Sequence, residues 1–248
     1  MSLLIAFLIL ITTLITAFIS GIFGMAGGLI LMGMLAAVVS IPQAMIIHGA
    51  IQFVANGWRA FLLRRHINWT LIRHYIVGAL IAIALLCFVN WVPDKPTLYL
   101  ILGLLPLLIW LPKNLFHADI LRKTDSIIAG FLVSGLNTLA GVAGPMLDIF
   151  FVRSDLTRQG IVANKSTTQA LAHLIKIGFW TGPAIQAAGM SALPPLWFLI
   201  AAIPISMTGT WLGGLVLHRM NDVNFKSWMK WLVTAIGVVF LLRAAGIF

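Results

Sequence analysis

Long apolar runs separated by short junctions dominate this sequence. A helix that crosses a bilayer needs about 20 mostly apolar residues, and several of the runs reach that length. The runs cover Leu3–Phe23, Leu29–Val39, Ala44–Leu63, Leu71–Trp91, Leu98–Leu111, Ile127–Ala140, Met146–Val152, Ile161–Trp180, Leu196–Leu217 and Trp228–Phe248. A soluble domain carries about 25% charged residues, whereas only 9% of these 248 residues are charged. We therefore expect an all-α, polytopic membrane protein.

Most of the basic residues behind the net charge of +10 lie in or beside the junctions between apolar runs. Nucleic-acid binding requires a basic patch or stripe on one face, so we exclude nucleic acid as a partner and expect the lipid bilayer instead. Lys and Arg in short loops mark the cytoplasmic ends of membrane helices. The junctions richest in them contain Arg64, Arg65 and Arg73; Lys113, Arg122 and Lys123; Arg153 and Arg158; and Arg219, Lys226 and Lys230. Placing these junctions inside the cell puts both termini outside.

Two glycine clusters, Gly24–Gly28 and Gly141–Pro145, share the pattern G-x-A-G at an offset of 117 residues (24 + 117 = 141). Each precedes an apolar run that is too short to cross a membrane alone. Glycine interrupts helices, and the start of a half-helix exposes N–H groups that favour anions. The clusters therefore predict broken or re-entrant helices that bind substrate through Gly24, Ala26, Gly27, Gly28, Gly141, Gly144 and Pro145. Close packing of small residues between helices is the alternative explanation.

The same offset continues into the next helix as a polar stripe. His48, Gln52, Asn56 and Arg59 correspond to Lys165, Gln169, His173 and Lys176, with spacings of four, four and three residues in each set. This spacing places each set on one face of its helix. The chain is therefore predicted to be one membrane domain of two repeats, residues 1–115 and 116–248, with about five helical segments each. The alternation of basic junctions predicts that the repeats are inverted.

The stripes provide the candidate transport path. Gln52, Asn56, Gln169 and His173 are expected to line it, with Lys165 and Lys176 supplying positive charge. His48 and Arg59 are candidates for coupling or gating. Polar side chains in membrane helices also form packing hydrogen bonds, and Arg59 and Lys176 lie near helix ends, from which they can extend to headgroups.

Asp148 is the only acidic residue within an apolar stretch, and all six acidic residues are aspartates. It follows Pro145 by three residues, so we expect it in the first turn of a short helix. There it would interact with the helix dipole, carry a coupling proton, or pair with Lys165 or Arg153. The single cysteine, Cys87, leaves no cysteine metal site, and no metal or cofactor is expected.

These residues resemble the TauE/SafE family of membrane permeases. The closest match runs from Gly141–Pro145 through Ser154–Arg158 to Asn164–Gln169 and His173–Lys176, and both halves of the chain take part. The resemblance implies a secondary transporter of the bacterial inner membrane that exports a small anion, such as a sulfur oxyanion or an organosulfonate. Protons are a candidate coupling ion, and the sequence gives no indication of oligomeric state.

Two other functions remain open from the sequence. A passive anion channel would use the same polar path. An intramembrane enzyme would use Ser20 or Ser134 with His48 or His173, because a serine nucleophile needs a positioned base. The duplication favours transport over catalysis, since a catalytic centre is asymmetric whereas both stripes keep matching polar positions.

Overall fold

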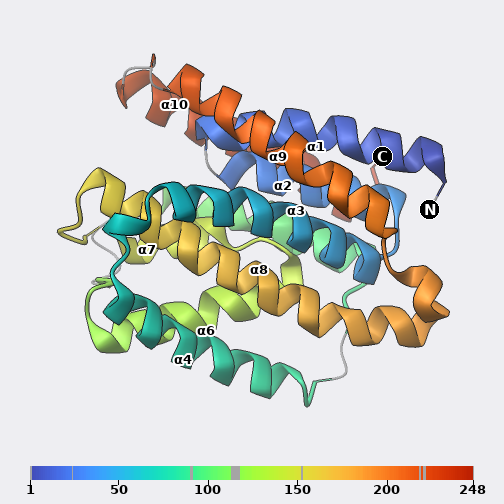
Figure 1. The fold of residues 1–248 in the computed structure, drawn as a ribbon, viewed down its shortest axis with the longest axis horizontal. Coiled ribbons are helices and arrows are strands. Elements are labelled where there is room, and N and C mark those ends of the chain that lie inside the picture. Colours follow the sequence, from blue (N-terminus) through green and yellow to red (C-terminus); the bar gives the residue numbers. More distant parts are fainter. Residues whose placement is uncertain are drawn as a thin grey trace.

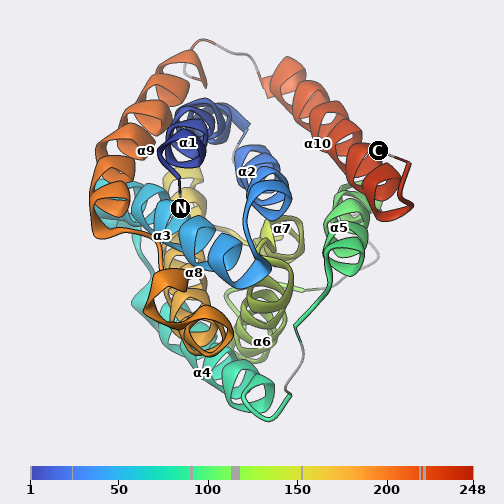
Figure 2. The ribbon, with the colours of Figure 1, turned by 90° about the vertical axis from the view of Figure 1, so that its right-hand side faces the viewer.

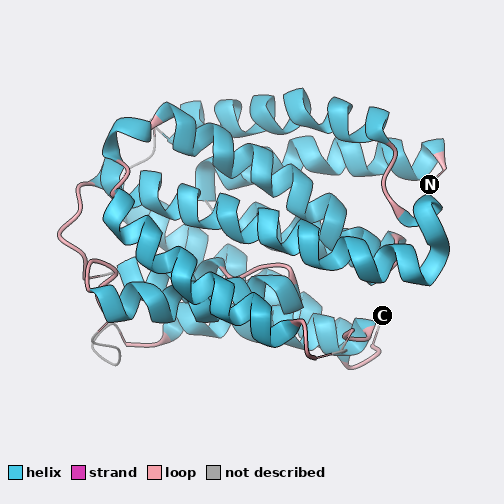
Figure 3. Ribbon diagram, turned by 60° about the horizontal axis from the view of Figure 1, so that its bottom comes forward, coloured by secondary structure: helices cyan, strands magenta, loops and turns pink. Residues whose placement is uncertain are grey.

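The computed structural model describes residues 2–23, 25–89, 92–112, 118–151, 153–217, 219 and 222–247. Within these residues the only regular secondary structure is helix, joined by loops and turns, and there is no strand (Figure 3). The predicted all-α fold is therefore confirmed. In the first half the helices are α1 (Leu3–Phe23), α2 (Met25–Val38), α3 (Ile41–Leu62), α4 (Trp69–Leu86) and α5 (Lys95–Leu104). In the second half they are α6 (Lys123–Ala140), α7 (Gly144–Phe151), α8 (Arg158–Ala188), α9 (Leu196–Leu217) and α10 (Asp222–Ala244).

Both short apolar runs form short helices, as the sequence predicts. α2 has 14 residues and α7 has eight, and both are too short to span a bilayer at about 1.5 Å per residue. α6 ends at Ala140 because Gly141 adopts a left-handed backbone conformation with φ of 82°, which glycine reaches without steric cost. In the first half α1 ends at Phe23 and α2 begins at Met25, and Gly24 between them lies outside the described residues.

Two helix boundaries differ from the sequence prediction. The run Leu98–Leu111 is divided between α5 and a 3-10 helix, Leu105–Trp110, and Pro106 at its start removes a backbone donor there. α8 continues beyond Trp180 to Ala188, although Pro183 lies inside it. Two shorter 3-10 helices, Arg64–His66 and Gly189–Ala192, follow α3 and α8.

The largest helix contacts are α1 with α9, α4 with α6, α3 with α8, and α5 with α10 (Figure 2). If the two halves are exchanged, so that α1 replaces α6 and α4 replaces α9, the first two contacts replace each other and the last two map onto themselves. Two equivalent halves would give this pairing. The division of the chain at residues 115 and 116 itself stays a prediction.

α3 and α8 run in opposite directions through the middle of the bundle (Figure 1). Near one end, Lys176 late in α8 contacts His48 early in α3. Near the other end, the Asn164 side chain of α8 binds the backbone of His66 and Asn68, just beyond α3, at 3.2 and 2.8 Å. The equivalent stripes of the two helices therefore face each other.

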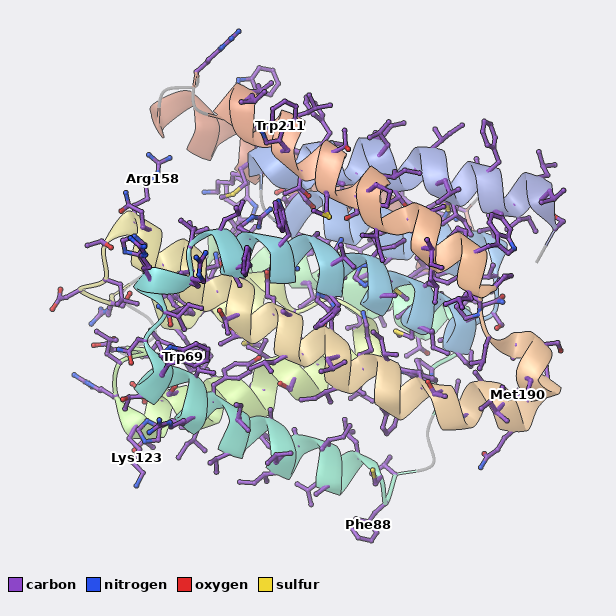
Figure 4. All side chains as sticks on the ribbon, viewed as in Figure 1. Trp69, Phe88, Lys123, Arg158, Met190 and Trp211 are labelled. Carbon is purple, nitrogen blue, oxygen red and sulfur yellow. The ribbon has the colours of Figure 1, made fainter. Side chains whose placement is uncertain are left out.

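The outer helices present apolar side chains to their surroundings. α1, α4 and α9 are long and apolar enough to cross a membrane, and their exposed side chains include Phe7, Leu80 and Ile200. The two ends of the bundle differ, since Lys123 and Arg158 lie at one end and Phe88 and Met190 at the other (Figure 4). Such an exterior requires lipid, so the chain is a multi-pass membrane protein.

The basic end is expected to face the cytoplasm, and cysteine labelling tests this. In a Cys87→Ala background, needed because Cys87 is exposed, Ser40→Cys and Ala188→Cys should react with a membrane-impermeant thiol reagent in intact cells. Arg65→Cys and Arg122→Cys, at the opposite end, should be protected until the cells are permeabilised. Labelling of Arg65→Cys from outside would contradict this orientation.

Candidate functional site

A cavity of about 410 Å³ lies between the two halves of the bundle. Ten of the predicted site residues line it: Gly28, His48, Gln52, Asn56, Arg59, Gly144, Asp148, Lys165, Gln169 and His173. They come from both stripes, from α2 and from α7. The structure thus brings together residues that lie more than 100 positions apart in the sequence.

Amide side chains contribute neutral polar groups to the cavity wall, which also contains apolar side chains. Gln52 and Asn56 are 8% and 4% exposed. The Asn56 amide donates to the backbone carbonyl of Gln52 at 3.0 Å, one turn earlier in the same helix. Gly28 faces Gln52 so closely that a Cβ on Gly28 would lie 3.6 Å from the Gln52 amide nitrogen. The first glycine cluster therefore approaches the first stripe at Gly28.

Charged side chains lie in the same cavity. Lys165 forms an ion pair with Asp148, and the two side chains keep only 27% and 30% of their surface exposed. Arg59 and Arg158 also line the cavity. Among the described lining residues, Arg59 and Lys165 alone outnumber the single acidic side chain, Asp148, so positive charge is in excess there.

The prediction that Asp148 lies in the first turn of its helix is wrong. α7 begins at Gly144, so Asp148 is its fifth residue, beyond the exposed N–H groups of the first turn. The Lys165 ammonium provides its stabilising partner instead.

Lys176 does not extend to headgroups, which corrects one of the alternatives for this residue. Its side chain is 0% exposed, and its Nζ donates to the Gly141 carbonyl at 2.8 Å and lies 2.7 Å from Nδ1 of His48. Nε2 of His48 lies 3.0 Å from the Gly28 carbonyl oxygen. Lys176 thus lies behind the cavity wall, whereas Arg59 faces the cavity.

The other cluster residues have packing roles in this structure. A Cβ on Gly27 would collide with the Thr16 carbonyl oxygen of α1, so Gly27 permits close approach of α1 and α2. Ala26 and Pro145 are buried, and Gly141 contributes its carbonyl to Lys176. Gly24 was also predicted as a site residue, and it lies outside the described residues.

Four polar lining residues were not predicted as substrate-binding residues, although Ser20 was considered as a nucleophile: Ser20, Asn137, Arg158 and Ser166. Ser20 and Asn137 are separated by 117 residues (20 + 117 = 137), so extending the repeat offset backwards from the clusters would have found both. Asn137 lies 3.5 Å from Nδ1 of His173. Arg158 was assigned only to a basic junction, although it begins α8 and faces the cavity.

No group of three His, Cys, Asp or Glu side chains suited to a metal ion occurs among the described residues. The cavity instead offers amides, hydroxyl groups and ammonium or guanidinium groups. The ammonium and guanidinium groups donate hydrogen bonds and carry positive charge, and the amides and hydroxyl groups can also donate, so this chemistry suits an anion.

Comparison with known proteins identifies the family. The sequence model of the sulfite exporter TauE/SafE family matches residues 9–240, nearly the whole chain. No curated protein and no solved structure matches the chain. Because this match covers nearly the whole chain, the chain belongs to the sulfite exporter TauE/SafE family of membrane transporters.

Proposed function

We propose that the cavity binds a small anion, a sulfur oxyanion or an organosulfonate, and that the protein carries it across the bacterial inner membrane by alternating access. The observation that supports this most directly is the excess of positive charge in the cavity. Among the described residues that line the cavity, Arg59 and Lys165 carry two positive charges against the one carboxylate of Asp148. The substrate class follows from the family.

Positive charge in the cavity offsets the hydration free energy that an anion loses when it enters a membrane protein. An anion that leaves water loses several kcal/mol or more of hydration. The start of α7 at Gly144 contributes only a partial charge, about half a unit. Full charges on Lys165 and Arg59 supply the remainder, and the amides of Gln52 and Gln169 are placed to donate hydrogen bonds.

The Lys165–Asp148 ion pair provides an exchange mechanism. While the cavity holds no anion, the carboxylate satisfies the Lys165 ammonium. An entering oxyanion displaces the Asp148 carboxylate and pairs with the Lys165 ammonium. A site that is already neutralised avoids the cost of an unpaired buried charge, so the pair lowers the energy of the empty transporter without blocking substrate entry.

The shape of the polar region favours a transporter over a passive channel. Beyond His48 and Lys176 the facing positions of α3 and α8 are apolar and buried, at Met45, Trp180 and Ala184. A channel needs a continuous polar path, whereas alternating access needs one closed end. The intramembrane enzyme receives less support, because the matching stripes supply similar groups from both halves.

A ligand screen by thermal stability tests the proposed function. A ligand that binds only the folded protein raises the midpoint of unfolding. Sulfite, sulfate, thiosulfate or a taurine-like sulfonate at saturating concentration should raise the midpoint, and carboxylates of similar size should raise it less. If none of the sulfur anions shifts the midpoint, the proposed substrate class is wrong.

Removing the charge of Lys165 should weaken anion binding. We expect Lys165→Gln to raise the dissociation constant at least tenfold, about 1.4 kcal/mol, because the amide cannot replace the ammonium. Asp148→Asn should bind the anion as tightly as the wild type or more tightly, since the competing carboxylate is gone. Lys123→Gln, at the exposed start of α6, is the matched control and should bind normally. Unchanged binding in Lys165→Gln would assign the lysine a structural role.

Replacing the paired amides should impair transport without unfolding the protein. Gln52→Leu and Gln169→Leu retain side-chain size but remove the hydrogen-bonding groups, so each should lower the rate of anion flux into proteoliposomes. Gln186→Leu, at an exposed position near the end of α8, should transport normally. Normal flux in both cavity variants would indicate that the stripes only pack helices together.

A further inference from the structure

Four groups form a continuous hydrogen-bonded chain at the deep end of the cavity, away from the basic end of the bundle. The Gly28 carbonyl contacts Nε2 of His48 at 3.0 Å, Nδ1 of His48 contacts Nζ of Lys176 at 2.7 Å, and Nζ also donates to the Gly141 carbonyl at 2.8 Å. The chain joins one residue from each glycine cluster to one residue from each stripe. It is therefore a single connection between both broken-helix regions and both central helices.

The partners on either side assign the proton on His48. The Gly28 carbonyl can only accept a hydrogen bond, so Nε2 of His48 must carry the hydrogen. In the neutral ring Nδ1 is then an acceptor, and it receives a hydrogen bond from Lys176. The chain is thus complete only while His48 holds one proton.

This chain lies where the polar cavity ends. The face of α8 that carries His173 and Lys176 continues with Trp180 and Ala184, both 0% exposed. On α3 the position one turn before His48 is Met45, also 0% exposed. His48 and Lys176 therefore separate the polar cavity from an apolar, closed region that extends toward the other end of the bundle.

The repeat offset relates the His48–Lys176 contact to an equivalent pair of residues on α3 and α8. Adding 117 converts His48 to position 165 and Arg59 to position 176. The His48–Lys176 contact thus corresponds to a contact between Lys165 and Arg59. Those two residues line the cavity instead, and Lys165 is paired with Asp148. Of the two equivalent contacts, only the one between His48 and Lys176 is made. This asymmetry is expected for a transporter whose cavity is open at one end and closed at the other.

We propose that His48 and Lys176 close the far end of the cavity and that uptake of a proton by Nδ1 of His48 opens it. The inference deepens the proposed transport function by naming its coupling group. A proton on Nδ1 removes the acceptor that Lys176 uses, and it places two cationic groups next to each other. The links from Gly28 and Gly141 to the central helices are then lost together.

The surroundings supply few other groups that titrate. His173 is the nearest, with its ring centre 5.4 Å from that of His48. From α6 the neighbouring polar group is the neutral Asn137. Among their described side chains α1, α2 and α9 carry no charge, so the remaining charged groups are those of the cavity: Arg59, Arg158, Lys165 and Asp148.

A cysteine reporter at the closed end tests the proposal without reference to any substrate. The variant Ala184→Cys, in a Cys87→Ala background, places a thiol two turns beyond Lys176 on the same face of α8. Its rate of reaction with a thiol reagent is measured in purified protein from about pH 8 down to about pH 4, a range that extends well below the ordinary titration of histidine. Each rate is divided by that of a protein carrying only the exposed Cys87, which corrects for thiol ionisation.

The normalised rate should rise as the pH falls, by up to about tenfold per pH unit across the transition. His48→Gln supplies a neutral donor and acceptor that cannot take up a proton, so the reporter should stay protected at every pH. Lys176→Met removes the closing contact and should leave the reporter reactive at every pH. His74→Gln, a histidine on α4 outside the cavity, is the control and should retain the wild-type pH profile.

Two results would overturn the proposal. One is a reporter rate that does not change with pH in the otherwise wild-type protein. The other is a pH dependence that persists in His48→Gln but disappears in Asp148→Asn, which would assign the proton to the carboxylate. Neither result depends on sulfite binding, so a failure of the proposed substrate class remains distinguishable from a failure of this switch.

Discussion

The antiparallel packing of α3 against α8 is the contact on which the cavity depends. Polar and ionisable side chains in a membrane helix must face a partner or water. Each of these helices carries a polar stripe, and their opposite directions bring equivalent stripes face to face. The contact is fixed near one end by His48 and Lys176 and near the other by Asn164, which binds the backbone beyond α3. The polar cavity occupies the space between these two attachments.

The broken helices complete the cavity because their backbone groups are not all used within helices. The Gly141 carbonyl lies after the end of α6 and is bound by Lys176. α7 starts at Gly144 in the cavity wall and carries Asp148 to Lys165. The two glycine clusters therefore have different roles from residue to residue: Gly28 and Gly144 face the cavity, Gly27 allows helices to touch, and Gly141 provides an acceptor.

The all-helical fold, the short helices and most of the polar side chains that line the cavity were predictable from periodicity and from the offset of 117 residues. The sequence does not determine how deeply a side chain is buried or which neighbouring helix it faces. Spacing places Lys176 on the same face as His173, but only tertiary packing decides that Lys176 lies behind the wall. Gly27 and Gly28 are neighbours in the sequence, yet about 100° of helix rotation directs one toward α1 and the other toward Gln52. The position of Asp148 depended on the exact start of α7.

In the proposed transport cycle an oxyanion occupies the cavity beside Lys165. The most direct measurement is anomalous X-ray scattering from crystals of the protein grown with selenite, a selenium analogue of sulfite. A selenium peak should appear between Lys165, Gln169 and Arg59, with the Asp148 carboxylate displaced from the ammonium. A peak only outside the cavity, or an intact Lys165–Asp148 pair next to bound selenium, would contradict the proposed site.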